Sequence, residues 1–302
     1  MTLPVTVVVC TRNRPELVRA AVTSILDGDE APLELIVVDQ SSAQTDDLEP
    51  LGAVTGCAVR HLRLAEPGLS RARNAGVHAA RCDIVAFVDD DVVVAANWLS
   101  ALLEPLDAAD DLATTGRVLI GQAEVPDALE PSSVVSSRPA VFAGRLRRDV
   151  LAGGNMAVPH RAFSEVGLFD EQLGAGAAYP AADDNDFGYR LLEAGYRIAY
   201  VPEAVVHHRA WRPGGDYVRL RWRYGIGQGG FYAKHASLRD PHVLRRFARH
   251  AAARVTSLPV RAFYDRRRLA GDLAFLAGLL TGFARWLATE RRRAPLRPTR
   301  GE

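Results

Sequence analysis

The sequence predicts an α/β protein built on buried parallel strands. Short apolar runs rich in valine and isoleucine recur through the first two thirds of the chain, and each ends in polar residues. Segments with helical spacing of apolar residues separate these runs, an alternation typical of β-α-β units. With 302 residues, 48% hydrophobic and 24% charged, the chain can form one large α/β domain with an appendage, and a wholly disordered or collagen-like protein is excluded.

The first β-α-β unit opens the chain. The runs at residues 5–10 and 33–38 are too short for free-standing helices, so we expect buried parallel strands there. Between them, Pro15 stands where a first helical turn tolerates proline. Apolar residues then follow at helical spacing, at Leu17, Val18, Ala21, Val22 and Ile25.

The same alternation continues to about residue 206. We expect strands at 59–64, 84–88, 113–120, 155–158, 198–201 and 204–206, and helices at 70–80, 98–106 and 187–194. Three prolines interrupt residues 121–150, so we expect a mobile loop over the site there. Ligands of open α/β sheets bind at the carboxyl ends of strands, so Thr11, Asp39 and the triplet Asp89-Asp90-Asp91 should share one edge.

Charge is distributed unevenly along the chain. Residues 1–208 carry 16 Lys and Arg against 30 Asp and Glu, whereas residues 209–302 carry 21 against 6. We therefore expect two parts, an α/β domain over residues 1–215 and a helical, arginine-rich extension over residues 216–302. The basic extension needs an anionic neighbour such as lipid headgroups, nucleic acid, a phosphate-bearing substrate or the acidic body itself.

An uncharged stretch of 12 residues, Leu273 to Ala284, lies in this extension between Arg266-Arg267-Arg268 and Arg291-Arg292-Arg293. It is too short to cross a bilayer, which takes about 20 residues. An interfacial helix at an anionic membrane surface and a helix packed on the α/β domain both remain open. No nucleic-acid-binding motif is present, so we expect no nucleic acid partner.

The three cysteines, Cys10, Cys57 and Cys82, form no CxxC or CxxH cluster, so neither a disulfide framework nor a structural zinc site is expected. The chain opens directly into strand-like sequence without a secretory leader. We therefore expect a cytoplasmic protein. A peripheral protein on the inner face of the cell membrane is compatible with this location.

Two acidic clusters stand out. The triplet Asp89-Asp90-Asp91 follows a buried strand, and adjacent carboxylates favour a divalent cation such as Mg²⁺ or Mn²⁺. Solvated or helix-capping carboxylates are the alternative. Asp183, Asp184 and Asp186 begin a helix, where negative charge also stabilises the helix dipole. Capping explains one such residue more readily than three.

His207 and His208 end the expected strand at 204–206, so only one of them can face the site. A hydrogen-bonded structural histidine is the alternative to a ligand. The segment Arg71-Ala72-Arg73-Asn74 begins a helix, where guanidinium and backbone N–H groups favour anions and planar bases. This segment matches neither a dinucleotide-binding G-x-G-x-x-G motif nor a phosphate loop.

Taken in order, these motifs resemble family 2 glycosyltransferases, which are inverting enzymes with the GT-A nucleotide-sugar-binding fold, a Rossmann-like mixed sheet flanked by helices. The likeness spans roughly residues 3–210 and makes residues 1–215 the catalytic domain. The motifs are Thr11-Arg12-Asn13-Arg14-Pro15, Val37-Val38-Asp39-Gln40-Ser41, Ala72-Arg73-Asn74-Ala75-Gly76, Asp89-Asp90-Asp91 as the DxD motif, Gly154-Asn155-Met156-Ala157 and Asp183-Asp184-Asn185-Asp186-Phe187.

The resemblance implies a role for each motif. Thr11 and Asn13 flank the nucleotide, Asp39 accepts from the base, and Arg73 approaches the base or the phosphates. Asp90 is a further donor-binding candidate, and Asp91, with Asp89, reaches the diphosphate through Mg²⁺ or Mn²⁺. His208, rather than His207, completes the metal shell. Asp184 is the general base, and Asp183 stands where the family usually has glutamate.

The implied reaction is a single displacement in which an acceptor hydroxyl attacks the anomeric carbon of a UDP-, GDP- or TDP-sugar. The acceptor expected is a cell-envelope glycan or a lipid-linked molecule. One rival is a sugar nucleotidyltransferase, but residues 11–15 lack the glycine and lysine of its phosphate loop. The other rival is a catalytically silent nucleotide-sugar-binding scaffold, which intact Asp91, Asp184 and His208 argue against.

Overall fold

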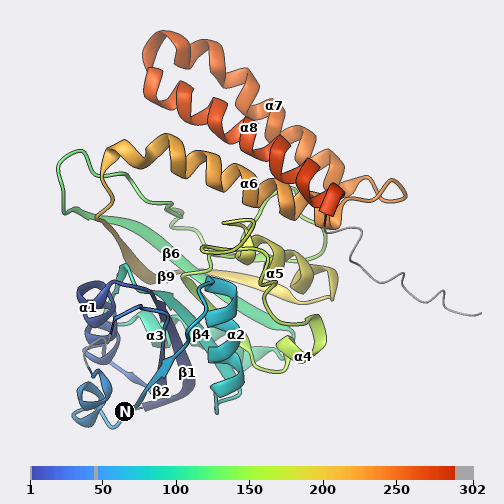
Figure 1. Cartoon of the computed structure of the whole chain (residues 1–302). Helices are drawn as coiled ribbons and strands as arrows, with labels where there is room; N and C mark the ends of the chain where they lie inside the picture. The colour runs from blue at the N-terminus through green and yellow to red at the C-terminus, as the bar shows by residue number, and fades with distance from the viewer. Residues whose placement is uncertain (1, 44–46, 290–302) are drawn as a thin grey trace, which may run out of the picture. The chain divides into compact units, whose positions relative to one another are not determined.

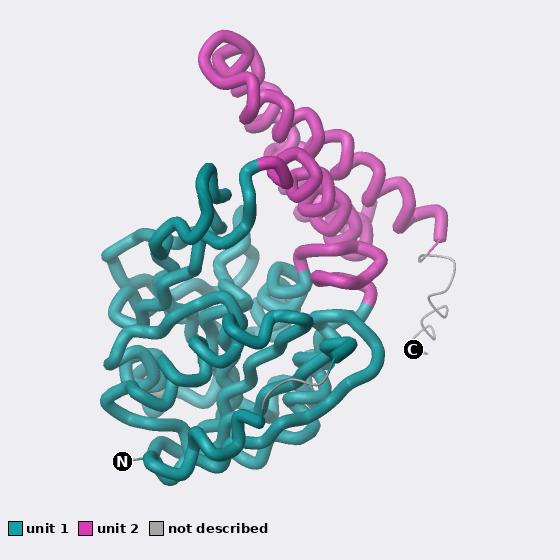
Figure 2. Tube along the Cα trace, turned by 60° about the vertical axis from the view of Figure 1, so that its left-hand side comes forward, with its two compact units in different colours: residues 1–171, 183–214 teal, residues 172–182, 215–302 magenta. Residues whose placement is uncertain are grey.

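The computed structural model describes residues 2–43 and 47–289 (Figure 1). The chain divides into two compact units (Figure 2). Unit 1 comprises residues 1–171 and 183–214, and unit 2 comprises residues 172–182 and 215–302. The short segment 172–182 therefore belongs with the C-terminal helices, although it lies between two parts of unit 1 in the sequence.

Unit 1 is an α/β unit with one continuous mixed sheet. Its strands are β1 Thr2–Thr11, β2 Ala31–Asp39, β3 Ala58–Arg63, β4 Ile84–Asp89, β5 Val92–Val94, β6 Leu112–Ala123, β7 Ala140–Phe142, β8 Asn155–Pro159 and β9 Arg197–Ala210. Its helices are α1 Pro15–Leu26, α2 Leu69–Ala79, α3 Trp98–Leu103, α4 Ala162–Val166 and α5 Asp183–Glu193, with short 3₁₀ helices at Glu49–Ala53 and Glu104–Ala108.

The strand order is β3-β2-β1-β4-β8-β6-β9-β5, and β7 pairs with β9. The first four strands in the chain, β1 to β4, pair in parallel, whereas β8 is antiparallel to β4. Thr11 lies opposite Asp39, and Cys10 lies opposite Asp89. This register confirms that the carboxyl ends of β1, β2 and β4 meet at one edge of the sheet.

Two apolar layers cover the sheet. Along β1, Val7 and Val9 belong to one layer with residues of α1 and α3, while Val8 belongs to the other layer with residues of α2 and α5. This period of two is what a strand buried on both faces requires. In the second layer Phe187 of α5 stacks on Phe163 with ring centroids 5.1 Å apart, which anchors the helix that begins with the second acidic cluster.

Three sequence expectations need correction. The strands expected at 198–201 and 204–206 are one strand, β9, whose pairing with β6 shifts between Gly116 and Arg117. Pro202 lies at this shift, where its missing N–H is tolerated. Helix α5 begins at Asp183, four residues before the start expected at residue 187, so the acidic cluster lies inside its first turn. Residues 121–150 contain the end of β6 and all of β7, and so are not wholly irregular.

Unit 2 is helical, with α6 Tyr217–His235, α7 His242–Tyr264 and α8 Arg266–Thr289. The backbones of α6 and α8 approach closely through glycines. A Cβ added at Gly225 would lie 2.2 Å from the Phe275 carbonyl, and one at Gly278 would lie 2.4 Å from the Trp222 carbonyl. Part of the uncharged stretch 273–284 is therefore buried against α6. Arg291-Arg292-Arg293 lie outside the described residues. In the part of the chain the structure describes, no helix combines the length and apolarity needed to span a bilayer.

Candidate active site

The aspartate triplet at the end of β4 sends its three carboxylates to three different partners. Asp89 lies against Arg73, Asp90 against Thr11, and Asp91 against His208. The chain turns directly from β4 into β5, so neighbouring side chains diverge. The triplet is therefore a junction between separate parts of the site and not a single acidic patch.

Asp91 and His208 are held together by strand pairing. Strand β5 starts one residue after Asp91 and pairs antiparallel with β9, with Val92 opposite His208. The His208 Nε2 atom consequently lies 3.2 Å from Asp91 Oδ1. Both histidines lie inside β9 instead of following a strand, and His208 is the one that contacts the triplet.

Cationic and aromatic groups surround the second oxygen of Asp91. Trp211 Nε1 donates to Asp91 Oδ2 at 3.0 Å, and Arg212 donates to the same oxygen at 3.4 Å. Burial alone would raise the pKa of Asp91, but the hydrogen bonds from His208 and Trp211 and the charge of Arg212 lower it. Burial likewise opposes protonation of His208, yet its bond to Asp91 raises the His208 pKa. Asp91 is thus held ionised.

The donor chemistry of this pair fits a divalent cation. A carboxylate oxygen and an imidazole nitrogen face each other at 3.2 Å, and substrate phosphates usually supply further ligands to Mg²⁺ or Mn²⁺. Asp89 lies apart, since one of its oxygens contacts Arg73. Within residues 2–43 and 47–289 no group of three or more His, Cys, Asp or Glu side chains is already gathered for a metal. The structure therefore brings Asp91 and His208 together, but not Asp89 with them.

Asp90 joins the triplet to the end of β1. Thr11 Oγ1 donates to Asp90 Oδ2 at 2.7 Å, and Arg14 donates to Asp90 Oδ1 at 2.8 Å. Burial raises the pKa of Asp90 to about 6, although Arg14 opposes this shift. The guanidinium of Arg14 also stacks on the Trp211 ring, 4.6 Å from its centroid. Arg14 therefore links Asp90, at the end of β4, to Trp211, which follows β9.

Arg73 is a buried cation that connects the two acidic clusters. Its side chain is 4% exposed and forms ion pairs with Asp183 and, at 3.2 Å, with Asp89. It also donates to the Gly153 carbonyl at 3.0 Å. Burial disfavours the charged guanidinium, but Asp183 and Asp89 outweigh this effect and raise the pKa of Arg73. The two clusters, about a hundred residues apart in sequence, thus meet at one guanidinium.

Asp184 lies in the first turn of α5, beside this network. Gly153 N–H donates to Asp184 Oδ2 at 3.2 Å, and Asn185 N–H donates to Oδ1 at 2.8 Å. Burial, reinforced by the neighbouring charge of Asp183, raises the pKa of Asp184 to about 7. A Cβ at Gly153 would lie 3.0 Å from both Arg73 and Asp184, so glycine lets both side chains reach this loop. A carboxylate with this pKa can accept a proton near neutral pH.

The predicted nucleotide contacts lie at the ends of β1 and β2. Asp39 is fully buried, and it accepts from Ser41 N–H at 2.7 Å and from Arg63 at 3.2 Å. Asn13 adopts a positive φ of 56°, and its side-chain oxygen accepts from Ser42 N–H at 2.9 Å. These bonds join the loops that follow the two strands at the edge that carries the triplet.

Several site residues were not assigned a role from the sequence. Arg14 stands in a quoted motif without a role, and Gly153 directly precedes the motif Gly154-Asn155-Met156-Ala157. Trp211 and Arg212 come immediately after the histidine segment. An arginine and a tryptophan just beyond a candidate metal-binding histidine could have signalled a charged, partly apolar rim.

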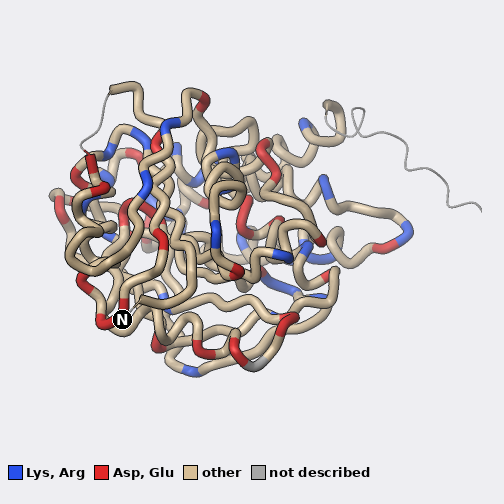
Figure 3. The backbone as a smooth tube through the Cα atoms, turned by 90° about the horizontal axis from the view of Figure 1, so that it is seen from below, with Lys and Arg blue, Asp and Glu red and all other residues tan. Residues whose placement is uncertain are grey.

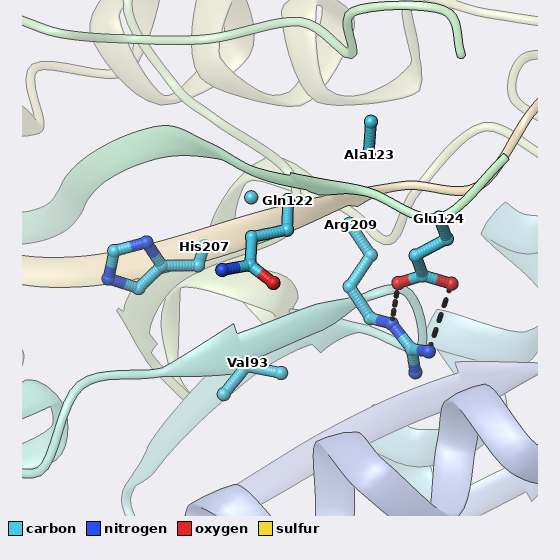
Figure 4. Close-up of a pocket in the computed structure, with 7 residues that line it drawn as sticks. Val93, Gln122, Ala123, Glu124, His207 and Arg209 are labelled. Atoms are coloured by element: carbon cyan, nitrogen blue, oxygen red, sulfur yellow. Dashed lines mark hydrogen bonds and ion pairs between the residues drawn. The ribbon is translucent and has the colours of Figure 1, made fainter. Parts of the chain in front are cut away.

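An open pocket of about 530 Å³ lies beside β9 (Figure 4). His207 lines it, whereas His208 faces Asp91. Glu124 and Arg209 form an ion pair in its wall. None of the predicted site residues lines this pocket, although Arg209 in its wall donates its backbone N–H to the Asp91 carbonyl at 2.8 Å.

Comparison with known proteins gives two family matches along the chain. The family described as Glycosyl transferase family 2 matches residues 6–167, and Glycosyl transferase family group 2 matches residues 129–289. The first match includes the triplet, Arg73 and Gly153, and ends before α5.

Curated relatives include glycosyltransferases of bacteria and archaea. Pre-mycofactocin glycosyltransferase of Mycobacterium tuberculosis is 31% identical over 248 residues, covering 80% of this chain and 50% of that protein. The chain thus spans about half the length of that relative. Glucosyl-dolichyl phosphate glucuronosyltransferase of Haloferax volcanii is 28% identical over 228 residues, covering 68% of this chain and 69% of that protein.

Solved structures share the fold at low sequence identity. Mannosyltransferase PcManGT of Pyrobaculum calidifontis, solved with GDP-Man and Mn²⁺, superimposes with a TM-score of 0.62 at 19% identity. That match covers 93% of this chain and 87% of the other. GalNAc-T7, solved with UDP, GalNAc and Mn²⁺, gives a TM-score of 0.54 at 19% identity, covering 80% and 52% of the two chains. These likenesses show the GT-A fold.

Proposed function

Because this chain belongs to glycosyl transferase family 2, we propose that it moves a sugar from a nucleotide-sugar donor to a hydroxyl acceptor with inversion at the anomeric carbon. The observation that carries the proposal is the position of Asp184. Its carboxylate is fixed by two backbone N–H groups, has a pKa of about 7, and lies beside the Arg73 network that includes the aspartate triplet.

In the proposed reaction Asp184 accepts the proton of the acceptor hydroxyl as its oxygen attacks the anomeric carbon. The bond from that carbon to the nucleoside diphosphate breaks at the same time, and its electron pair leaves with the diphosphate. Attack from the face opposite the leaving group inverts the configuration. Gly153 N–H and Asn185 N–H hold the carboxylate in place for this step.

Asp91 and His208 are the residues that would hold a divalent cation, with Asp89 as the third candidate. When bound, Mg²⁺ or Mn²⁺ supplies positive charge to the diphosphate leaving group. Arg14 and Arg212 add fixed positive charge beside Asp91. Thr11, Asn13, Asp39, Arg73 and Asp90 remain the residues proposed for the donor edge. The bonds of Arg73 to Asp89, Asp183 and Gly153 favour a positioning role for it.

The proposed acceptor is a cell-envelope glycan or a lipid-linked molecule at the inner face of the membrane. Two relatives support this class by name. One is the glucosyl-dolichyl phosphate glucuronosyltransferase above, and the other is succinoglycan biosynthesis protein ExoM of Rhizobium meliloti, which is 28% identical and covers 68% of this chain.

The decisive experiment is a thermal-shift screen of UDP-, GDP- and TDP-sugars with and without Mn²⁺. A ligand that binds only the folded protein at 100 times its Kd adds about 2.7 kcal/mol of stability. We expect one nucleotide class to raise Tm, more strongly with Mn²⁺. The donor so identified is then tested for release of nucleoside diphosphate. If no nucleotide sugar shifts Tm under any condition, the proposal fails. Formation of a sugar nucleotide from a triphosphate would favour the nucleotidyltransferase instead.

A further inference from the structure

Two adjacent aromatic side chains are almost fully exposed at the end of α7. Phe263 is 87% exposed and Tyr264 is 86% exposed, and Val260 in the same turn is 62% exposed. Soluble proteins seldom leave a cluster of large apolar side chains in water unless it contacts another surface. We call these three residues the hairpin tip, because α7 turns back into α8 directly after them (Figure 1).

Other large apolar side chains are also exposed on both helices. On α7, Val255 is 52% exposed, and on α8, Leu273 and Leu280 are 49% and 60% exposed. Leu273 and Leu280 are seven residues apart, two helical turns, and so share a face. The opposite side of α8 is buried, with Phe275 and Leu279 at 4% and 0% exposure. Helix α8 therefore packs through the face that carries Phe275 and Leu279, and the face that carries Leu273 and Leu280 stays exposed.

Positive charge borders the hairpin tip. Arg266, Arg267 and Arg268 follow it and are all exposed. Residues 172–182 and 215–289 together carry 14 Lys and Arg against 4 Asp and Glu. Figure 3 marks these residue types along the backbone. One of the four acidic residues, Asp272, is fully buried among arginines, with Arg254 at 2.8 Å. Asp265, between Tyr264 and Arg266, pairs with Arg268 at 3.3 Å, so the charge beside the tip is three arginines against one aspartate and is positive.

We propose that the hairpin tip and the arginines after it bind an anionic lipid bilayer at its interface, with Phe263 and Tyr264 inserted among the headgroups. The apolar ring of Phe263 and the ring of Tyr264, which carries a hydroxyl, suit the boundary between headgroups and acyl chains. The arginines beside them contact lipid phosphates. A second copy of the same surface fits less well, because the two arginine clusters would repel each other. Nucleic acid offers phosphates but no apolar layer for Val255, Val260 and Leu280.

The test is flotation of the full chain with vesicles of phosphatidylcholine alone or with about 30% phosphatidylglycerol. The wild type should float with the anionic vesicles only, and raising NaCl from about 0.1 to about 0.5 M should weaken this binding through screening. The double variant Phe263→Ser/Tyr264→Ser should reduce the bound fraction roughly tenfold or more, since it removes the apolar contacts.

Leu238→Ser is the matched control. Leu238 is 92% exposed in the loop before α7. It lies beyond the opposite end of α7 from the tip, and α7 is a helix of 23 residues, about 35 Å long. This variant should float like the wild type, and circular dichroism should show unchanged helix content in all variants.

The proposal is overturned if the wild type fails to float, binds neutral and anionic vesicles equally, or loses binding equally with Leu238→Ser. It is also overturned if light scattering shows a dimer that Phe263→Ser/Tyr264→Ser dissociates, because the surface would then be a self-association interface. The assay measures binding alone, so its outcome is independent of the proposed sugar transfer.

Discussion

Replacing Arg73 by methionine tests the link between the two acidic clusters. The side chains of Arg73 and Asp183 are 4% and 8% exposed, so their ion pair is screened little by water. Removing one partner of a buried ion pair costs about 3–5 kcal/mol, because the other charge stays buried without compensation. Arg73→Met also leaves the Gly153 carbonyl without its donor. We expect a loss of unfolding free energy in this range.

Urea and thermal unfolding followed by circular dichroism measure this loss. For a unit of about 200 residues each kcal/mol moves Tm by about 2–4 °C, so the expected decrease is about 6–20 °C. The neighbouring Arg71 provides a matched control. Its side chain is 35% exposed and pairs with Glu171, which is 44% exposed. Arg71→Met should therefore cost less than about 1 kcal/mol.

A second substitution identifies the cause. If the stranded carboxylate of Asp183 is responsible, Asp183→Asn added to Arg73→Met should recover part of the lost stability. If Arg73→Met costs no more than Arg71→Met, or if the double variant is less stable by the sum of both single losses, Arg73 does not hold the clusters together electrostatically.

Three further outcomes test the chemistry. Asp184→Asn should keep donor binding but lower transfer by about 10²–10⁴-fold. The isosteric surface change Glu171→Gln is the control and should leave transfer within about twofold of the wild-type rate, which is about the scatter of such assays. Near wild-type transfer by Asp184→Asn would show that another group is the base. Transfer needs ionised Asp184, so with its pKa of about 7 the rate should rise with pH and level off above neutrality, and a rate independent of pH between 5 and 8 would contradict the assignment. Asp91→Ala should weaken donor binding at least roughly tenfold with Mn²⁺ in calorimetry but little without it; equal losses under both conditions would place Asp91 outside any metal site.

The sequence alone determined most of the alternation of strands and helices in unit 1, apart from β5, β7, α4 and the unity of β9, and it also determined the sheet edge that carries the site. Buried strands and amphipathic helices leave periodic apolar patterns, and these are local properties of the chain. Thr11, Asp39 and Asp89 end three such strands, so their common edge followed from β-α-β geometry. The resemblance to the family implied His208 rather than His207 as the metal ligand; that role stays a prediction, and His208 lies against Asp91.

Only the tertiary structure decided what each of these side chains contacts. Adjacent residues such as Asp89, Asp90 and Asp91 point to different partners because the chain turns between β4 and β5. Arg73 reaches Asp183 across 110 positions, and Trp211 reaches Asp91 across 120. The exposure of Phe263 and Tyr264 at the hairpin tip likewise depends on how the helices of unit 2 pack. Such contacts depend on how separated elements pack, and no local periodicity records that information.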